Sequence, residues 1–342
     1  MKTNAKTLDH MNLLRVFGIS IVVLRHTFAP FTNSWSISEY YEYDMIADFI
    51  GRYISTLSMP LFVFISGYIY SYLRNSLKKY KTYKILTHKK TRRLLVPYLF
   101  FALIYDYFFL EFDSVSTYLS HLWFGSGHLW FLLMMFIMFL LFYPFENYFR
   151  KNIIHGFIIA IGLYLTVLPM HYLNMNPIAH VFKYFVYFYL GYLFYLNSSK
   201  VLTFLKGKSL LFFLIHFLLF TGYFFALKST DNIYYQAAID QVLLVLGILS
   251  ICFVYSVLNI LYTKEKDRIN KYNRIIKSIN VNSYYIYIFH QPILKVFFSY
   301  ALIQELYIPM AVISGFLLSF ILSLVTGILV LKFKAGRLLI GS

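Results

Sequence analysis

Long apolar segments alternate with short polar ones along the 342 residues of this chain. A membrane-spanning helix requires about 20 mainly apolar residues, and the pattern contains ten segments of this kind. Their approximate bounds are 11–30, 46–73, 94–111, 128–148, 153–172, 179–197, 209–228, 236–262, 281–301 and 308–331. The sequence therefore predicts an all-α, polytopic membrane protein with ten transmembrane helices. We expect residues 1–342 to form a single integral-membrane domain.

The distribution of charge supports this count and suggests an orientation. If both termini lie in the cytoplasm, 25 of the 31 Lys and Arg residues fall in segments on the inner side. The outer loops then hold almost no basic residue and carry acidic ones such as Asp44, Asp231 and Glu305. Cytoplasmic loops of membrane proteins are enriched in Lys and Arg. We therefore predict an even number of spans with both termini cytoplasmic.

Composition agrees with a membrane protein and argues against a soluble protein and against a nucleic-acid-binding protein. Hydrophobic residues make up 60% of the chain and charged residues only 13%, against roughly 25% charged in soluble proteins. The net charge of +17 does not indicate nucleic-acid binding, because the basic residues lie in short loops between apolar spans. Cys252 is the only cysteine, so no intrachain disulfide can form.

Two ionisable residues stand out in the first span. Arg15 and His26 are eleven residues apart, which on a helix corresponds to about three turns and an axial offset of roughly 16 Å, so they share a face. Ionisable residues within a span are costly and indicate function. His26 is a candidate general base or nucleophile, or a histidine bonded between helices. Arg15 is a candidate ligand for phosphate or carboxylate, or it extends to the inner headgroups.

The second span contains Pro60, followed by Ser66 and Gly67. Proline removes a backbone donor and commonly kinks or breaks a helix, so we expect a bend or a short re-entrant break there. Broken helices within a membrane face protein or water, which makes this stretch a candidate cavity wall. Alternatively, Ser66 and Gly67 allow a neighbouring helix to approach closely.

Five further residues are candidates on position alone. Arg92 and Arg93 precede the third span on the same predicted side as Arg15, where they form an anion site or an ordinary positive flank. His128 and Trp130 open the fourth span on the outer side, where they either stack on a sugar ring or anchor the helix at the interface. His290 lies in the middle of the ninth span and is a second candidate for a polar cavity.

Motifs of soluble enzymes are missing from the sequence. It contains no phosphate-binding glycine loop, no G-x-S-x-G and no H-E-x-x-H motif. Its His and Cys residues do not cluster at metal-ligand spacing. The sequence therefore gives no support for an ATP-driven mechanism or for a metal site.

Several motifs resemble acyltransferase family 3, the bacterial integral-membrane O-acyltransferases of cell-surface sugars. The most specific one is an Arg followed by ten residues and a His, matched by Arg15 and His26. FVFISGY matches an apolar run ending in Ser-Gly-Phe, and KKTRRLLVPYL matches a basic cluster entering an apolar-Pro-Tyr segment. HLWFL, YFYLGYLF and YYIYIFHQPIL resemble weaker landmarks. The family commonly has an Asp where this chain has Asn12, and it often separates two arginines by two residues where this chain has adjacent Arg92 and Arg93.

This resemblance implies a reaction and its partners. The donor is a cytosolic acyl-CoA, either acetyl-CoA or succinyl-CoA, whose phosphates meet Arg15, Arg92 and Arg93. The thioester extends toward His26, and Ser66 positions or carries the acyl group. The transfer is either direct or proceeds through an acyl-enzyme.

The acceptor implied by the resemblance is a hydroxyl of a cell-surface polysaccharide or a lipid-linked saccharide, contacted by His128, Trp130 and His290. The protein then lies among the lipids of the bacterial cytoplasmic membrane. The competing interpretation is a polysaccharide exporter or flippase, which also requires a polar cavity through its spans.

Overall fold

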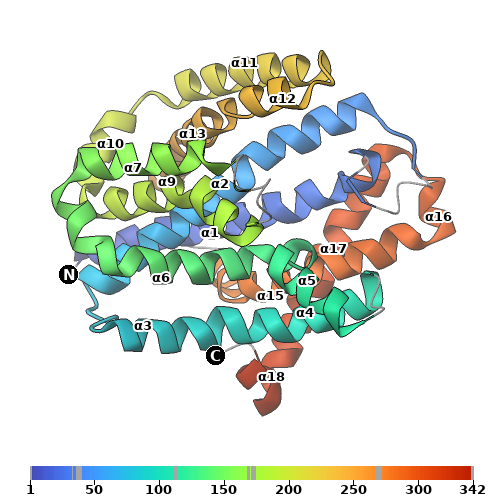
Figure 1. Ribbon diagram of the computed structural model, residues 1–342, viewed down its shortest axis with the longest axis horizontal. Coiled ribbons are helices and arrows are strands. Elements are labelled where there is room, and N and C mark those ends of the chain that lie inside the picture. The colour runs from blue at the N-terminus through green and yellow to red at the C-terminus, as the bar shows by residue number, and fades with distance from the viewer. Residues whose placement is uncertain are drawn as a thin grey trace. The chain divides into compact units, whose positions relative to one another are not determined.

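The structure is a computed structural model, and it describes residues 2–32, 34–35, 41–110, 114–167, 170, 175–265 and 272–339. Within these ranges the regular structure is helical throughout, without a β-strand (Figure 1). The helices, in chain order, are α1 (Lys2–Thr27), η1 (Ala29–Thr32), α2 (Met45–Asn75), α3 (Tyr83–Lys90), η3 (Thr91–Leu95), α4 (Val96–Phe109), α5 (Val115–Phe124), η4 (Gly127–Leu129), α6 (Trp130–Lys151), α7 (Ile153–Leu165), α9 (Asn176–Leu196), α10 (Ser198–Leu205), α11 (Ser209–Lys228), α12 (Ile233–Ile239), α13 (Val242–Lys264), α15 (Asn273–Ser299), α16 (Ala301–Gln304), α17 (Ile308–Lys332) and α18 (Lys334–Leu339).

Each of the ten apolar segments falls on a helix, which confirms the all-α prediction. These helices are α1, α2, α4, α6, α7, α9, α11, α13, α15 and α17. Among the described residues, five helical segments are long and apolar enough to cross a membrane: Met45–Asn75, Gly127–Lys151, Ser209–Lys228, Tyr235–Lys264 and Ile308–Lys332. The chain is therefore a multi-pass membrane protein, and ten spans with cytoplasmic termini stay a prediction. Part of the predicted span 153–172 lies outside the described residues.

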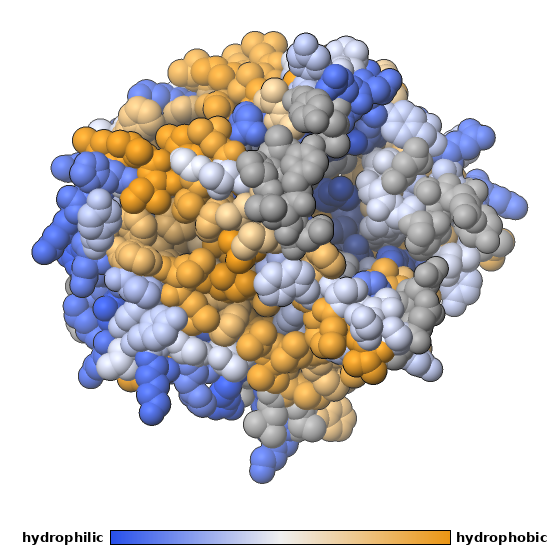
Figure 2. Space-filling model, viewed as in Figure 1, coloured by the Kyte–Doolittle hydropathy of each residue, from blue (hydrophilic) through white to orange (hydrophobic). Residues whose placement is uncertain are grey.

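Hydrophobic side chains are exposed on the helices, as expected where lipid is the solvent. Helix α11 shows this clearly, since Leu210, Leu218 and Phe225 are 66%, 68% and 55% exposed. Figure 2 shows the resulting hydrophobic surface along this helix, at the top of the view. Soluble monomers rarely expose contiguous apolar patches of this kind. The surface pattern thus agrees with the hydropathy of the sequence.

The chain forms two compact units. The first comprises residues 1–65 and 199–328, and the second comprises residues 66–198 and 329–342. In the first unit, α1 packs against α15 and α13, and α11 packs against α13. In the second unit, α9 packs against α6 and against α7, which lies beside it in Figure 1.

Helices α1 and α15 run parallel to each other. Their contacts pair Asn12 with Asn280, and His26 with His290, so residue numbers increase together along both helices. This arrangement gives the polar residues of α1 polar partners on α15 over more than three turns. The α1–α15 contact within the first unit therefore positions the candidate site.

Helix α2 differs from the sequence prediction at Pro60. The helix runs without a break from Met45 to Asn75, with Pro60 buried inside it, so the predicted re-entrant break is wrong. Nearby hydroxyls supply additional hydrogen bonds, since Thr56 donates to the Tyr53 carbonyl at 2.7 Å and Ser58 to the Ser55 carbonyl at 3.1 Å. Neither carbonyl is the one that Pro60 leaves without its helical donor, which is that of Thr56, four residues earlier.

Gly67 lies where the backbones of α2 and α9 meet in the second unit. A Cβ atom at this position would clash with the carbonyl oxygen of Phe188. Small residues allow membrane helices to approach this closely. The structure therefore supports the packing interpretation for Gly67.

Candidate active site

The structure brings together two histidines that the sequence singled out separately. His26 lies at the end of α1, and His290 lies near the middle of α15. The Nε2 atom of His290 is 3.2 Å from the Nδ1 atom of His26. The ring centroids are 4.9 Å apart with an interplanar angle of 63°. This edge-on contact is a hydrogen bond between two imidazoles.

Backbone carbonyls determine where the protons of this pair lie. The Nδ1 atom of His290 is 2.7 Å from the Tyr287 carbonyl and 3.0 Å from the Ile286 carbonyl. The Nδ1 atom of His26 is 2.9 Å from the Val22 carbonyl. A carbonyl oxygen only accepts hydrogen bonds, so each neutral ring carries its proton on Nδ1. The lone pair of His290 Nε2 then accepts from His26 Nδ1, and the lone pair of neutral His26 lies on its Nε2 atom.

The two rings differ in accessibility. His290 is fully buried, whereas His26 is half-buried. The Trp35 ring lies beside His26, at 6.4 Å between centroids and 26° between planes. Helix α17 holds the buried member of the pair in place, because Ser319 donates to the backbone carbonyl of His290 at 3.0 Å. A reactant can therefore contact His26 while His290 supports it from the protein interior.

Arg15 lies farther along the same contact between α1 and α15. Its guanidinium donates to the Ser283 hydroxyl at 3.4 Å. One turn before it, Asn12 accepts a hydrogen bond of 2.7 Å from the side chain of Asn280. The partners of Arg15 and Asn12 on α15 were not among the predicted site residues. Their signal in the sequence is a polar stripe, since Asn280, Ser283 and His290 recur at helical spacing within an apolar span.

Arg92 and Arg93 belong to the second unit. They lie in η3, a π-helical turn between α3 and α4, where both side chains are exposed. The neighbouring lysines face aromatic rings instead, with Lys90 Nζ 3.3 Å from the centroid of Phe139 and Lys89 Nζ 5.9 Å from that of Tyr80. A single π-helical turn often occurs at a functional site. This turn distinguishes the two arginines from the rest of the basic cluster.

His128 and Trp130 also belong to the second unit, and both contact other aromatic residues. His128 is 5% exposed, with its ring edge-on to Tyr105 at 5.5 Å between centroids. Trp130 packs on His180 at 4.4 Å and on Tyr184 at 5.8 Å. His180 was not among the predicted site residues, although it belongs to this aromatic cluster. These contacts give both residues a packing role within the unit.

Sequence reasoning also missed a buried charge in the second unit. The carboxylate of Glu146 on α6 is 4% exposed. It accepts from the Arg74 guanidinium at 2.9 Å, from the Tyr70 hydroxyl at 3.0 Å and from the Tyr192 hydroxyl at 3.2 Å. These residues lie on three helices, so no spacing within one helix could have revealed the cluster.

Comparison with known proteins gives one match. The model of acyltransferase family 3, described as an acyltransferase domain, matches residues 8–331. The chain matches no curated protein and no solved structure. The matched range includes most of α1, all of α15 and most of both compact units. Because it covers nearly the whole of a multi-pass chain, this protein belongs to acyltransferase family 3 and is a membrane acyltransferase.

Proposed function

We propose that this protein is an O-acyltransferase that moves an acyl group from cytosolic acyl-CoA to a hydroxyl of a cell-surface or lipid-linked glycan. Acetyl is the proposed acyl group, with succinyl as the alternative. The proposed location of this reaction is the bacterial cytoplasmic membrane. The observation that carries the proposal is the hydrogen bond between His26 and His290, because it leaves the His26 lone pair on Nε2.

The proposed reaction uses that lone pair as a general base. His26 Nε2 takes the proton of the acceptor hydroxyl while the oxygen attacks the thioester carbonyl. The bond between the carbonyl carbon and sulfur then breaks, and an ester and a CoA thiolate result. The thiolate takes up the proton from His26, which regenerates the neutral imidazole. General bases of this type contribute typically 10²–10⁴-fold to the rate.

His290 is the proposed positioning residue for His26. When His26 becomes an imidazolium, its Nδ1 proton points at the lone pair of His290 Nε2, 3.2 Å away. The hydrogen bond holds the ring of His26 in one orientation and stabilises its charged form. This role resembles that of the third residue in a catalytic triad, which also acts on the Nδ1 proton of a histidine.

The remaining predicted site residues take proposed binding roles. Arg15, Arg92 and Arg93 bind the phosphates of acyl-CoA, since guanidinium groups form strong paired hydrogen bonds to phosphate. The proposed role of Ser66 is to position or carry the acyl group. His128 and Trp130 are the proposed glycan contacts, His128 beside Tyr105 and Trp130 together with His180 and Tyr184.

The decisive experiment measures release of CoA from acetyl-CoA by the purified full-length protein in detergent, supplied with a cell-envelope glycan fraction. Acetylated glycan is detected by mass spectrometry. We expect His26→Ala to lower turnover by about 10²–10⁴-fold without changing thermal unfolding. The matched control is His155→Ala, since His155 is an exposed histidine of α7.

The same assay tests the exporter interpretation. An exporter consumes neither acetyl-CoA nor succinyl-CoA. If CoA is released from neither donor, the proposed function is contradicted. If turnover falls equally in the His26 and His155 variants, the catalytic role of His26 is contradicted but the proposed function is not.

A further inference from the structure

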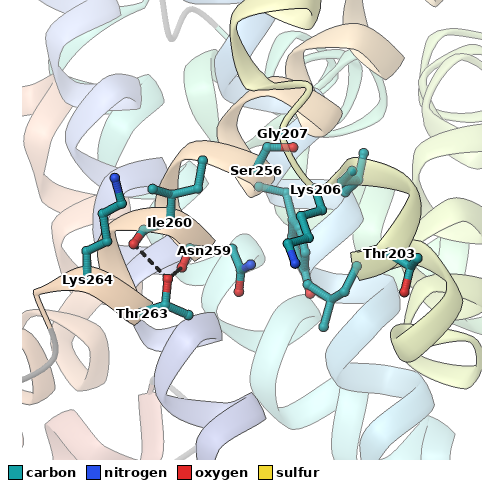
Figure 3. Close-up of a pocket in the computed structure, with 11 residues that line it drawn as sticks. Thr203, Lys206, Gly207, Ser256, Asn259, Ile260, Thr263 and Lys264 are labelled. Carbon is teal, nitrogen blue, oxygen red and sulfur yellow. Dashed lines mark hydrogen bonds between the residues drawn. The ribbon is translucent and has the colours of Figure 1, made fainter.

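The first unit contains a pocket that is separate from the histidine pair. It has a volume of about 450 Å³, within the range of small-molecule sites. Its walls come from the end of α13 and from α10 with the residues that follow it (Figure 3). The proposed reaction assigns no role to this pocket.

The charge lining this pocket is positive. Lys206 and Lys264 line it, and no Asp or Glu is among the lining residues. Among the described residues, neither ammonium group belongs to an ion pair. In Figure 3 the side chain of Asn259 lies between the two lysines. Two cationic side chains and one amide side chain therefore belong to residues of the same pocket, and together they suit an anion.

Two hydroxyl groups in the pocket already donate to the backbone. Thr263 donates to the carbonyls of Asn259 and Ile260, at 3.0 and 2.9 Å (Figure 3). Ser256 donates to the carbonyl of Cys252 at 2.6 Å. These bonds leave the lysines and the Asn259 amide as the strongest donors for a ligand. Charged donors of this type prefer phosphate or carboxylate oxygens.

The apolar part of the lining restricts the ligand further. Leu202, Leu205 and Ile260 contribute aliphatic surface to the pocket, and Tyr255 adds an aromatic ring. A small inorganic anion would leave this surface uncovered. A ligand that combines an anionic group with an apolar body fits both parts of the lining.

The surroundings of the pocket favour a membrane interface. Helix α10 is short and has both lysine and apolar residues, including Phe204, which is 57% exposed. Lys208 lies over the ring of Phe204, 4.1 Å from its centroid. Segments with exposed aromatic residues and several lysines bind at the boundary between headgroups and acyl chains. Both lysines of the pocket also fall in segments for which the charge pattern predicts a cytoplasmic location.

We propose that this pocket binds the phosphate of an amphipathic ligand, with Lys206, Lys264 and Asn259 as its donors. An anionic phospholipid of the inner leaflet is one source of this phosphate. The nucleotide end of a CoA ester is the other source. With a lipid as the source, the proposal is independent of acyl transfer. With a CoA ester as the source, it rests on the proposed function and adds a second contact to the donor beside Arg15, Arg92 and Arg93.

The test compares binding of phosphatidylglycerol and phosphatidylcholine to the full-length protein by native mass spectrometry and thermal shift. We expect preferential binding of phosphatidylglycerol. Substitution of both pocket lysines, Lys206→Ala with Lys264→Ala, should weaken this binding by about 10–30-fold, since each lysine near a headgroup contributes about 1 kcal/mol. The matched control is Lys332→Ala with Lys334→Ala, which removes the same charge from two exposed lysines that do not line the pocket.

A second arm distinguishes the two sources of phosphate. CoA and 3′,5′-ADP are added to the protein in neutral detergent. A thermal shift that depends on the pocket lysines, together with displacement of phosphatidylglycerol, assigns the pocket to the nucleotide. Retention of phosphatidylglycerol in excess CoA assigns it to the lipid.

A third variant, Ile260→Trp, fills the pocket without changing its charge and should also weaken binding. Three results overturn the proposal. The first is that phosphatidylglycerol binds no better than phosphatidylcholine, and that neither CoA nor 3′,5′-ADP gives a thermal shift that depends on the pocket lysines. The others are equal weakening of binding by both pairs of lysine substitutions, and unchanged binding in Ile260→Trp. Turnover of acetyl-CoA is measured in parallel, so that failure of this site is separable from failure of the proposed reaction.

Discussion

The histidine pair of the first unit and the Glu146 cluster of the second unit are both polar groups within apolar helices, yet their bonding differs. At Glu146 a cation and two phenol hydroxyls donate to one carboxylate, so the buried charge is compensated. At His26 the hydrogen bonds fix the proton on Nδ1 and leave a basic lone pair on Nε2. The first arrangement stabilises a structure, whereas the second arrangement can accept a proton.

This difference gives a criterion for polar groups within membrane proteins. A charged group whose partners satisfy it is expensive to remove but has little chemistry to offer. A group whose partners orient it and leave its reactive atom accessible is a candidate for catalysis. Substitutions at the two centres should therefore affect different quantities, stability at Glu146 and turnover at His26.

The largest expected effect on stability is that of Glu146→Ala. This change leaves the Arg74 guanidinium without its counter-ion and removes the acceptor of Tyr70 and Tyr192. Breaking a buried pair typically costs about 3–5 kcal/mol, and we expect a loss of this size in the free energy of unfolding. Turnover per folded molecule should stay within about threefold of wild type, because the cluster has no proposed contact with substrate.

The measurement for Glu146 is denaturant unfolding in detergent, beside acetyl-CoA turnover normalised to folded protein. Glu305→Ala is the matched control, since Glu305 is exposed and its loss should change neither quantity. If Glu146→Ala abolishes turnover while unfolding is unchanged, Glu146 belongs to the chemistry and the distinction between the two centres fails.

An intermediate effect is expected for His290→Ala. Loss of an orienting hydrogen bond of this type typically costs 10- to 100-fold in activity. We expect the loss in kcat with little change in the KM for acetyl-CoA, because His290 acts on His26 and not on the donor. His290→Gln should restore part of kcat, since its amide oxygen can accept from His26 Nδ1. A rise in KM alone, or equal defects in both variants, contradicts the positioning role.

The sequence predicted much of the first centre because its signals lie within single helices. The spacing of Arg15 and His26 places both on one face of α1 from periodicity alone. What periodicity could not give was the partner helix. The contact of His26 with His290 joins residues 264 positions apart, and only packing of α1 against α15 brings them together.

The same limit explains the errors and omissions of the sequence analysis. The Glu146 cluster depends on three helices, so it left no pattern in any one of them. Pro60 was expected to bend or break its helix from local chemistry, but α2 continues through this position, where Pro60 is buried. Helix existence is a local property, whereas the bonding of a buried polar group depends on tertiary packing.

The smallest expected effect comes from giving the Arg15 guanidinium a nearby carboxylate, as Arg74 has in Glu146. Asn12→Asp keeps an acceptor for Asn280 and adds a carboxylate one turn before Arg15. Such a pair stabilises a helix by about 0.2–0.5 kcal/mol, so unfolding should change little. If Arg15 binds the phosphates of acyl-CoA, the new carboxylate competes for its guanidinium, and the KM for acetyl-CoA should rise by about two- to threefold with kcat unchanged. Asn12→Ala removes the acceptor without adding charge and should leave KM unchanged while lowering stability by about 1 kcal/mol. A KM that rises equally in both variants excludes competition by the new carboxylate, because Asn12→Ala adds none, and removes Arg15 from the donor site.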